Sequence, residues 1–125
     1  MNKEFVKYEQ SLALKELGFD EPCIGWYNPQ VNYKKVTTDK YWAFHLTGEW
    51  ENFKPAPLYQ QAFRFFREKH KLEPEIMSDM MGYVASIVDR NVPLKIRLKP
   101  SNLFQTYEEA EQACLDKLIE IIKSK

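Results

Sequence analysis

The C-terminal stretch from Thr106 to Ile122 constrains the fold most, because it combines a helix start signal with a long apolar stripe. Thr106-Tyr107-Glu108-Glu109 matches the capping box, in which the Thr and Glu side chains satisfy backbone N–H groups that lack a partner at a helix start. Such a helix is stable only when its apolar face is buried. That face comprises Tyr107, Ala110, Cys114, Leu118 and Ile121, widened on one flank by Leu115, Ile119 and Ile122.

Two further helices are indicated nearer the N-terminus. The first ends at Gly18, which can adopt the left-handed conformation of a helix C-terminus, so that Phe19 packs back on Leu14 in a Schellman motif. The second begins at Pro57, which suits the first helical position, and runs to about Lys71, where Glu73-Pro74 stops it. One arc of the second helix is apolar and contains Leu58, Tyr59, Ala62, Phe63, Phe65 and Phe66.

Strand-forming residues fill the two blocks between these helices. The first block runs from Cys23 to about Phe53 and predicts strands at Cys23–Tyr27, Val31–Val36 and Tyr41–Leu46, followed by a loop over Gly48–Pro57. The second block runs from Glu75 to Leu98 and predicts a hairpin with the arms Gly82–Val88 and Leu94–Leu98. In the second arm, apolar residues alternate with Lys95, Arg97 and Lys99, as in a half-buried strand.

The order α-β-β-α-β-β-α with short connections favours an α+β fold: a small antiparallel sheet with three helices packed mainly on one face. At 125 residues, the chain has the length of a single domain, residues 1–125. It is 44% hydrophobic, which is enough for a core without disulfides or a structural metal.

Composition and motifs argue against several classes of function. Eighteen basic side chains balance eighteen acidic ones, so no global positive charge supports binding to nucleic acid or to a membrane surface. No signal peptide or membrane-spanning segment is found, which makes the cytoplasm the expected location. There is no glycine-rich phosphate loop and no clustered metal-ligand spacing, so we expect no cofactor and no metal.

A catalytic constellation is not recognisable either, and we expect that the protein is not an enzyme. Cys114 lies in the apolar stripe of the third helix, where a cysteine acts as an inert apolar residue. Cys23 and His45 are the only nucleophile and base that could be paired, and packing or capping of the sheet explains both better than catalysis does. His70 is explained by packing or by capping of the second helix.

Aromatic residues crowd the first strand block, which holds all three tryptophans. Because consecutive strand residues point to opposite faces, Trp26 and Tyr27, or Tyr41 and Trp42, cannot all enter one core. The exposed members would be interface anchors, unless the loop Gly48–Pro57 covers them. The residues that we expect at such a surface are Trp26, Tyr41, Trp42 and Trp50.

Two further features extend the candidate interaction surface. The basic residues Lys95, Arg97 and Lys99 could bind single-stranded nucleic acid together with nearby aromatics, or could protect an edge strand from aggregation. Leu115 and Ile119 lie beyond what one sheet contact would bury, so they could contact another helix or a second copy of the chain.

Three stretches carry a resemblance to a family: Glu16–Cys23, Ala56–Lys69 and Thr106–Ile122. In order and spacing they resemble short proteins of unknown function encoded in phage and prophage regions of gut bacteria related to Bacteroides. The resemblance implies a bacterial cytoplasm and a mobile-element origin, and it transfers no activity, cofactor or catalytic residue.

The sequence therefore favours a small accessory module that binds a protein partner or a second copy of itself. The alternative is a nucleic-acid-binding accessory protein that uses Lys95, Arg97 and Lys99, and the least favoured interpretation is an enzyme with a Cys23/His45 pair.

Overall fold

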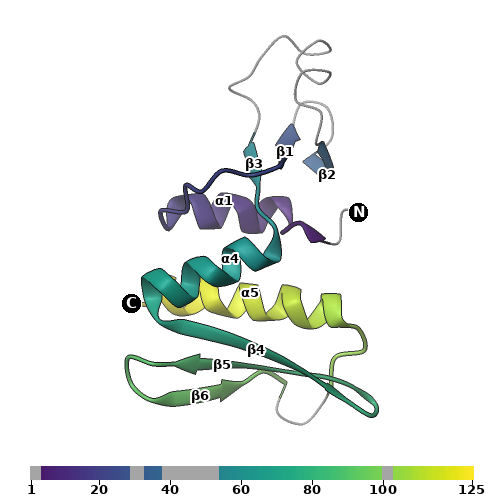
Figure 1. The fold of residues 1–125 in the computed structure, drawn as a ribbon, viewed down its shortest axis with the longest axis vertical. Coiled ribbons are helices and arrows are strands. Elements are labelled where there is room, and N and C mark those ends of the chain that lie inside the picture. Colours follow the sequence, from purple (N-terminus) through teal and green to yellow (C-terminus); the bar gives the residue numbers. More distant parts are fainter. Residues whose placement is uncertain (1–3, 29–32, 38–53, 100–102) are drawn as a thin grey trace. The chain divides into compact units, whose positions relative to one another are not determined.

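A computed structural model describes residues 4–28, 33–37, 54–99 and 103–125. The chain divides into two compact units, Met1–Ala62 and Phe63–Lys125, and the division falls inside the second helix. Each unit combines helix with antiparallel strands, which confirms the α+β prediction (Figure 1). The prediction of one sheet is wrong, since the described strands form two three-stranded sheets. That all 125 residues form one domain stays a prediction.

The first helix, α1 (Tyr8–Glu16), ends in the Schellman motif that the sequence predicts. Gly18 has a φ of +97°, and its N–H donates to the carbonyl of Lys15 over 3.1 Å. The Phe19 N–H donates to the carbonyl of Leu14 over 3.0 Å, and both of these side chains are buried. Two carbonyls at the helix end are thereby satisfied, and the chain is turned towards the first strand.

In the first unit, β1 (Gly25–Asn28) lies between β2 (Tyr33–Thr37) and β3 (Lys54–Ala56). The strand β3 lies within the predicted loop, so that part of the loop prediction is wrong: the Lys54–Ala56 backbone pairs with β1. A Cβ atom at Gly25 would lie 2.6 Å from Val36 and 2.7 Å from Phe5, so this close approach needs a glycine. The predicted strand Tyr41–Leu46 lies outside the described residues.

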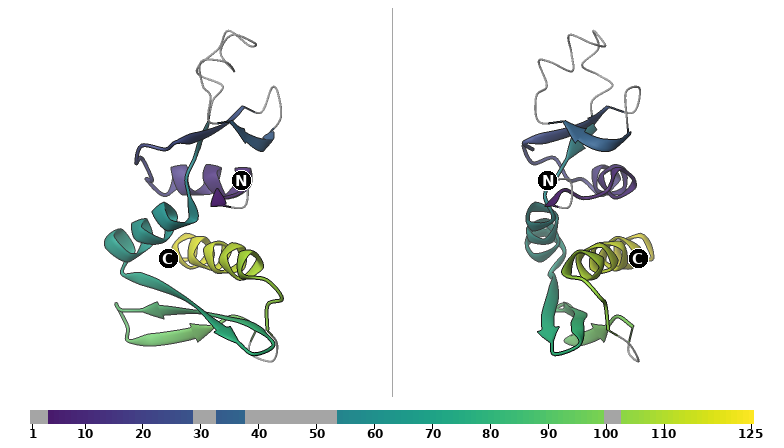
Figure 2. Two further views of the ribbon diagram at one scale, coloured as in Figure 1. Left: turned by 45° about the vertical axis from the view of Figure 1, so that its right-hand side comes forward. Right: turned by 90° about the vertical axis from the view of Figure 1, so that its right-hand side faces the viewer.

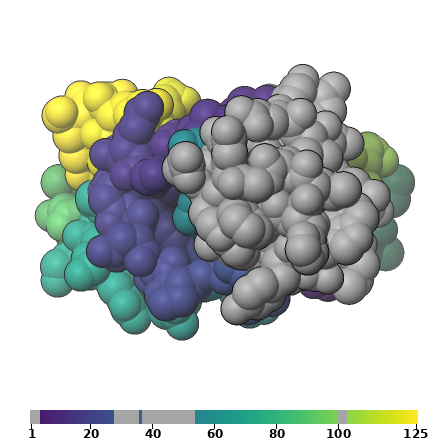
Figure 3. Space-filling model, turned by 90° about the horizontal axis from the view of Figure 1, so that it is seen from above, coloured from purple at the N-terminus to yellow at the C-terminus, as the bar shows by residue number. Residues whose placement is uncertain are grey.

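Tyr27 organises the core of this unit. Its hydroxyl donates to the carbonyl of Val6, and its ring packs edge-on against Tyr8 at 5.5 Å between ring centroids. Phe5, Ala56 and Leu58 complete the cluster. Figure 3 shows the surface that the α1–β1 part of the unit presents, coloured purple to blue.

The second helix starts later than the sequence predicts and ends at Lys71, as predicted. Pro57 precedes the helix, because its carbonyl accepts the Val6 N–H over 2.9 Å. The helical residues are α4 (Tyr59–Phe65), continued by one π-helical segment, η2 (Phe66–His70). Lys71, in the left-handed conformation, ends it before Pro74 is reached. The predicted apolar arc is buried apart from Leu58, which is half-buried.

The second unit holds the sheet β4 (Leu72–Asp79), β5 (Gly82–Asp89) and β6 (Leu94–Arg97), with β5 in the centre. The β5–β6 hairpin confirms the prediction. The sequence interpretation missed β4, because it assigned Glu73-Pro74 only as the signal that stops the second helix. An edge strand tolerates proline, whose missing N–H faces away from the ladder, and Pro74 pairs with Ile87 on the edge strand β4.

The helix α5 (Tyr107–Lys123) lies across one face of this sheet (Figures 1 and 2). Thr106 caps it as predicted: its Oγ1 accepts the Glu109 N–H over 3.1 Å. Ala85, Phe104 and Ala110 form a buried cluster between the sheet and the helix, together with Ile76, Tyr83, Leu98 and Ala113. By the alternation of strand residues, Glu73, Glu75, Lys95 and Arg97 belong to the opposite face.

We predict that Gly18→Ala destabilises the protein by about 1–2 kcal/mol, because an L residue at this φ strains the backbone. Nothing lies within 4 Å of the position that a Cβ would take, so the loss reports the backbone alone. Urea unfolding followed by circular dichroism measures the loss. Lys15→Ala, an exposed control in the same helix, should stay within about 0.5 kcal/mol of wild type. Equal stability of Gly18→Ala and wild type would contradict the Schellman assignment.

Candidate functional site

The predicted aromatic surface is placed only in part. Trp26 is half-buried in β1, and its neighbour Tyr27 is buried, with burial first and Glu9 second raising the pKa of its hydroxyl to about 12. Tyr41, Trp42 and Trp50 lie outside the described residues. The aromatic surface therefore stays a prediction.

Of the two alternatives that the sequence left open for Leu115 and Ile119, burial within the chain fits the structure and contact with a second copy does not. Leu115 is 0% and Ile119 is 7% exposed, so neither offers a surface to a partner. The buried arc of α5 includes Ala110, Cys114 and Leu118 as well. The chain itself thus covers the whole of this arc, and Leu115 and Ile119 leave the candidate interaction surface.

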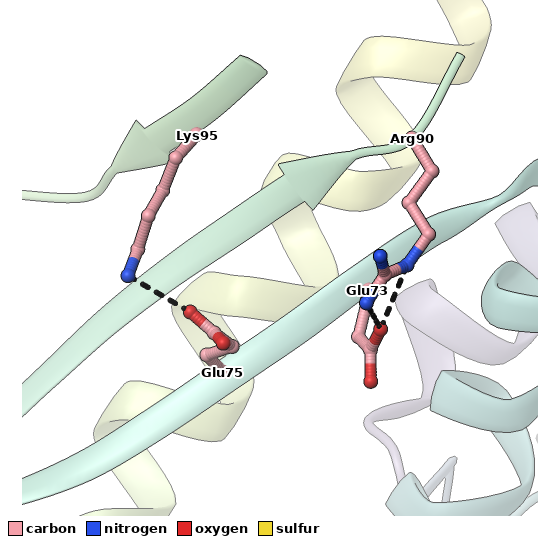
Figure 4. A network of polar contacts seen from close by, with 4 residues as sticks. All are labelled: Glu73, Glu75, Arg90 and Lys95. Carbon is pink, nitrogen blue, oxygen red and sulfur yellow. Dashed lines mark hydrogen bonds and ion pairs between the residues drawn. The ribbon is translucent and has the colours of Figure 1, made fainter. Parts of the chain in front are cut away.

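The basic residues after β5 differ in what surrounds them. Lys95 Nζ lies 3.1 Å from Glu75 Oε1, and the Arg90 Nε–H donates to Glu73 Oε2 over 3.0 Å. Figure 4 shows both pairs in front of α5: Lys95 of β6 reaches across the central strand β5 to Glu75 of β4, and Arg90, just after β5, reaches Glu73 of β4. Pairs this exposed contribute little stability, but they offset two of the positive charges. The sheet face opposite α5 is therefore a mixed ionic surface and not a basic one.

Arg97 and Lys99 lie at the end of β6 and have other environments. Arg97 makes no ion pair with any described residue and is exposed. Lys99 has a positive φ of 46°, and its Nζ lies 4.6 Å from the centre of the Phe104 ring. The chain turns away from the sheet at this residue and returns at Phe104, which pairs with Tyr83.

A groove lies where the chain leaves and rejoins the sheet, with a volume of about 450 Å³. Its walls come from the end of β6, from Phe104 and from the exposed side of α5. The apolar lining residues are Ile96, Leu98, Phe104 and Ala113, and the cationic ones are Arg97, Lys99 and Lys117. Lys117 Nζ also lies 3.3 Å from Glu120 Oε1, whereas no carboxylate is among the described residues that line the groove. We call this feature the β6 groove.

The open edge of β6 adjoins the same groove. The Leu98 N–H donates to the Ala85 carbonyl over 2.9 Å, which marks Leu98 and, two residues earlier, Ile96 as residues bonded to β5. By the alternation of an antiparallel ladder, the backbone groups of Lys95 and Arg97 point away from β5. No strand among the described residues pairs with these outward groups, so they can pair with a strand of another molecule.

Exposed methionines form a second feature that the sequence interpretation missed. Met80 is 99%, Met81 79% and Met77 54% exposed, at the turn that joins β4 to β5. We call these residues, with Asp79, the hairpin tip. The signal was present in the sequence: Asp79-Met80-Met81-Gly82 is a turn between two strand-forming runs. It was missed because β4 was not recognised.

The thiols and histidines show no sign of catalytic activation. Burial raises the pKa of Cys114 to about 12, as its predicted place in the core requires. Burial and then Glu21 raise the pKa of Cys23 to about 11, which disfavours a thiolate. His70 packs against Phe65 and Phe66, and its pKa is lowered by burial and then by Lys125. His45, the proposed partner of Cys23, lies outside the described residues.

Other kinds of site find no support in the described part of the chain. Among these residues, no three His, Cys, Asp or Glu side chains gather to hold a metal ion. None of the helices there has the length and apolar character required to cross a membrane. The first unit has a smaller hollow of about 250 Å³ beside α1, where Lys15 and Lys54 face the same space as Asp20 and Glu21. Its mixed charges select no ligand class.

No protein-family model matches the chain, and neither a curated protein nor a solved structure is significantly similar to it. The resemblance to phage-encoded proteins stays a prediction. The argument for function therefore rests on the β6 groove, the open edge and the hairpin tip.

Glu111 makes the stability of the second unit depend on pH. Burial, and then the charge of Glu108, raise the pKa of its carboxyl to about 7. Between about pH 4.5 and pH 7, the Glu111 carboxyl is therefore protonated in the folded protein and ionised in the unfolded chain. Because the folded state binds the extra proton, the free energy of unfolding decreases as the pH rises through this range.

We predict that Glu111→Gln removes this loss. The melting temperature of the variant relative to wild type should rise between pH 5 and pH 8 in a thermal melt followed by circular dichroism. Glu68→Gln, at an exposed position of the same unit, is the control for removal of one carboxylate. A difference between Glu111→Gln and wild type that does not change with pH would contradict the assignment.

Proposed function

We propose that this protein is an interaction module that binds an extended segment of a protein partner at the β6 groove and the open edge beside it. The observation that carries the proposal is the lining of the groove: Arg97, Lys99 and Lys117 line it together with apolar residues, beside the edge strand β6. Strand addition of this kind obtains affinity from backbone hydrogen bonds and specificity from the side chains on either side.

The two edges of the sheet are not equivalent, which favours β6 as the docking edge. Pro74 lies in β4, and its missing N–H removes one donor from the outward edge of that strand. β6 has no proline, and it offers the outward backbone groups of Lys95 and Arg97. Its four residues correspond to about 13 Å of strand, so a partner segment of roughly four to six residues would span it.

The charge of the groove selects the chemistry of the partner. Arg97 and Lys99 make no ion pair with a described residue, whereas Lys117 is offset by Glu120. The two remaining cations favour Asp or Glu in the bound segment, and a guanidinium such as Arg97 can hold a carboxylate in two hydrogen bonds. Ile96, Leu98, Phe104 and Ala113 offer apolar surface to the side chains between these acids. We therefore propose a segment in which acidic and aliphatic residues alternate.

Binding of nucleic acid and catalysis have less support. Glu73 and Glu75 neutralise Arg90 and Lys95 on the sheet face that a single strand would have to cover. The raised pKa values of Cys23 and Cys114 disfavour a nucleophile. The phage-related origin that the sequence resemblance implies is compatible with a small docking module in a bacterial cell.

We predict that selection from a library of random eight-residue peptides enriches segments with alternating acidic and aliphatic residues. Fluorescence polarisation with an enriched peptide measures the effect of Arg97→Glu, which should weaken binding about tenfold or more, since it replaces an attractive charge in the groove with a repulsive one. Replacing alternate residues of the peptide with proline should also abolish binding, because a paired strand needs its N–H groups.

The matched control is Arg67→Glu, the same charge change at an exposed position in the second unit away from the groove lining, and it should bind the peptide as wild type does. Selection of basic peptides, or binding that is unaffected by Arg97→Glu, would refute the proposal. Salt-dependent binding of single-stranded DNA without any peptide binding would favour the nucleic-acid alternative.

A further inference from the structure

The hairpin tip is an exposed apolar surface that the fold does not use. The chain has four methionines, and the three after Met1 are all at this tip. A single exposed apolar side chain is ordinary on a protein surface, but several flexible thioether side chains together are typical of surfaces that bind other proteins.

The tip is held in a defined conformation. Asp79 pairs with Gly82 at the end of an eight-residue ladder, and the Met81 N–H donates to Asp79 Oδ1 over 3.2 Å. A Cβ atom at Gly82 would lie 2.5 Å from the carbonyl oxygen of Phe104, so the chain behind the tip is packed against backbone. The methionines are therefore presented by a fixed turn, which lowers the entropy cost of docking.

All charged residues of the β4–β5 hairpin are acidic. From Leu72 to Asp89 it contains Glu73, Glu75, Asp79 and Asp89 and no lysine or arginine. Glu73 and Glu75 are in ion pairs, and Asp89 is buried, with its Oδ1 accepting the Asn91 N–H. Asp79 is thus the carboxylate that accompanies the exposed methionines. The tip combines apolar side chains with one acid.

These are the properties that the β6 groove selects. An apolar and acidic knob and an apolar and cationic groove belong to the same unit, and both lie towards the end of the sheet where β4 turns into β5 (Figure 1). A chain cannot fill its own groove in this way, because the ladder from Leu72 to Asp79 holds the tip in line with the strands, whereas the groove opens beyond the opposite edge. The occupant has to be another molecule.

We infer that the hairpin tip of one copy of this chain docks in the β6 groove of a second copy. The inference rests on the proposed function, since it assigns a partner to the same groove. Because tip and groove lie at one end of the unit, a two-fold axis places each tip in the other copy's groove and closes the assembly as a dimer. Met80 and Met81 enter the apolar part of the groove, and Asp79 faces Arg97 and Lys117.

Two variants test this inference by complementation. The tip variant carries Met80→Lys and Met81→Lys, and the groove variant carries Arg97→Glu and Lys117→Glu. All four positions lie on the surface or partly exposed, so both variants should keep the wild-type circular dichroism spectrum. Sedimentation equilibrium should give a dimer for wild type and a dissociation constant at least about tenfold larger for each variant alone.

An equimolar mixture of the two variants should form a dimer again. In the mixed dimer, one contact is native and the other joins the lysines introduced at the tip to the glutamates introduced in the groove, so both are attractive. Val92→Lys, which adds one charge at the exposed turn between β5 and β6, is the control and should dimerise as wild type does.

The outcomes separate the inference from the proposed function. A wild-type protein that stays monomeric at every concentration overturns self-docking, and peptide binding that depends on Arg97 would then leave the proposed function standing. A wild-type dimer that neither variant weakens, or variants that fail to associate when mixed, also overturns the inference. Recovery of the dimer only on mixing supports it.

Discussion

The backbone bridge between Tyr83 and Phe104 is the contact on which the second unit depends. The two residues exchange N–H···O hydrogen bonds of 2.9 Å each, across 21 positions of sequence. The bridge requires a glycine at position 82, because any side chain there would meet the Phe104 carbonyl. By returning the chain to the sheet just before Thr106, it fixes the start of α5. By placing the Phe104 ring below Lys99, it also supplies part of the β6 groove.

The sequence predicted the features whose partners are close along the chain. The first helix ends where the N–H groups of Gly18 and Phe19 donate to carbonyls three and five positions earlier, respectively, and Thr106 caps a helix by accepting the N–H of Glu109. The β5–β6 hairpin likewise follows from alternation within one arm, from Leu94 to Leu98. In each case both partners of the interaction lie within a few residues of each other, so the residue types in that short segment predict the structure.

The features that failed depend on distant partners or on strand position. Pro74 breaks a central strand but not an edge strand, and only the strand order shows that β4 is an edge. The periodicity of α5 could not decide whether Leu115 and Ile119 are buried by the chain or by a second copy, because it does not show what covers them. The β6 groove brings Arg97 and Lys117 together across 20 positions, and no spacing rule anticipates that.

The charges at β6 bear on what can pair with its open strand edge. An unpaired edge pairs with any extended chain unless something discourages it, and lysine or arginine on the edge is a common protection. Lys95 is offset by Glu75, whereas Arg97 remains unpaired among the described residues. Identical β6 edges therefore repel each other at Arg97, while an acidic segment is attracted. Under the proposed function, the same residue would discourage unspecific edge pairing and favour an acidic segment, so selectivity of this kind would need no further element of the fold.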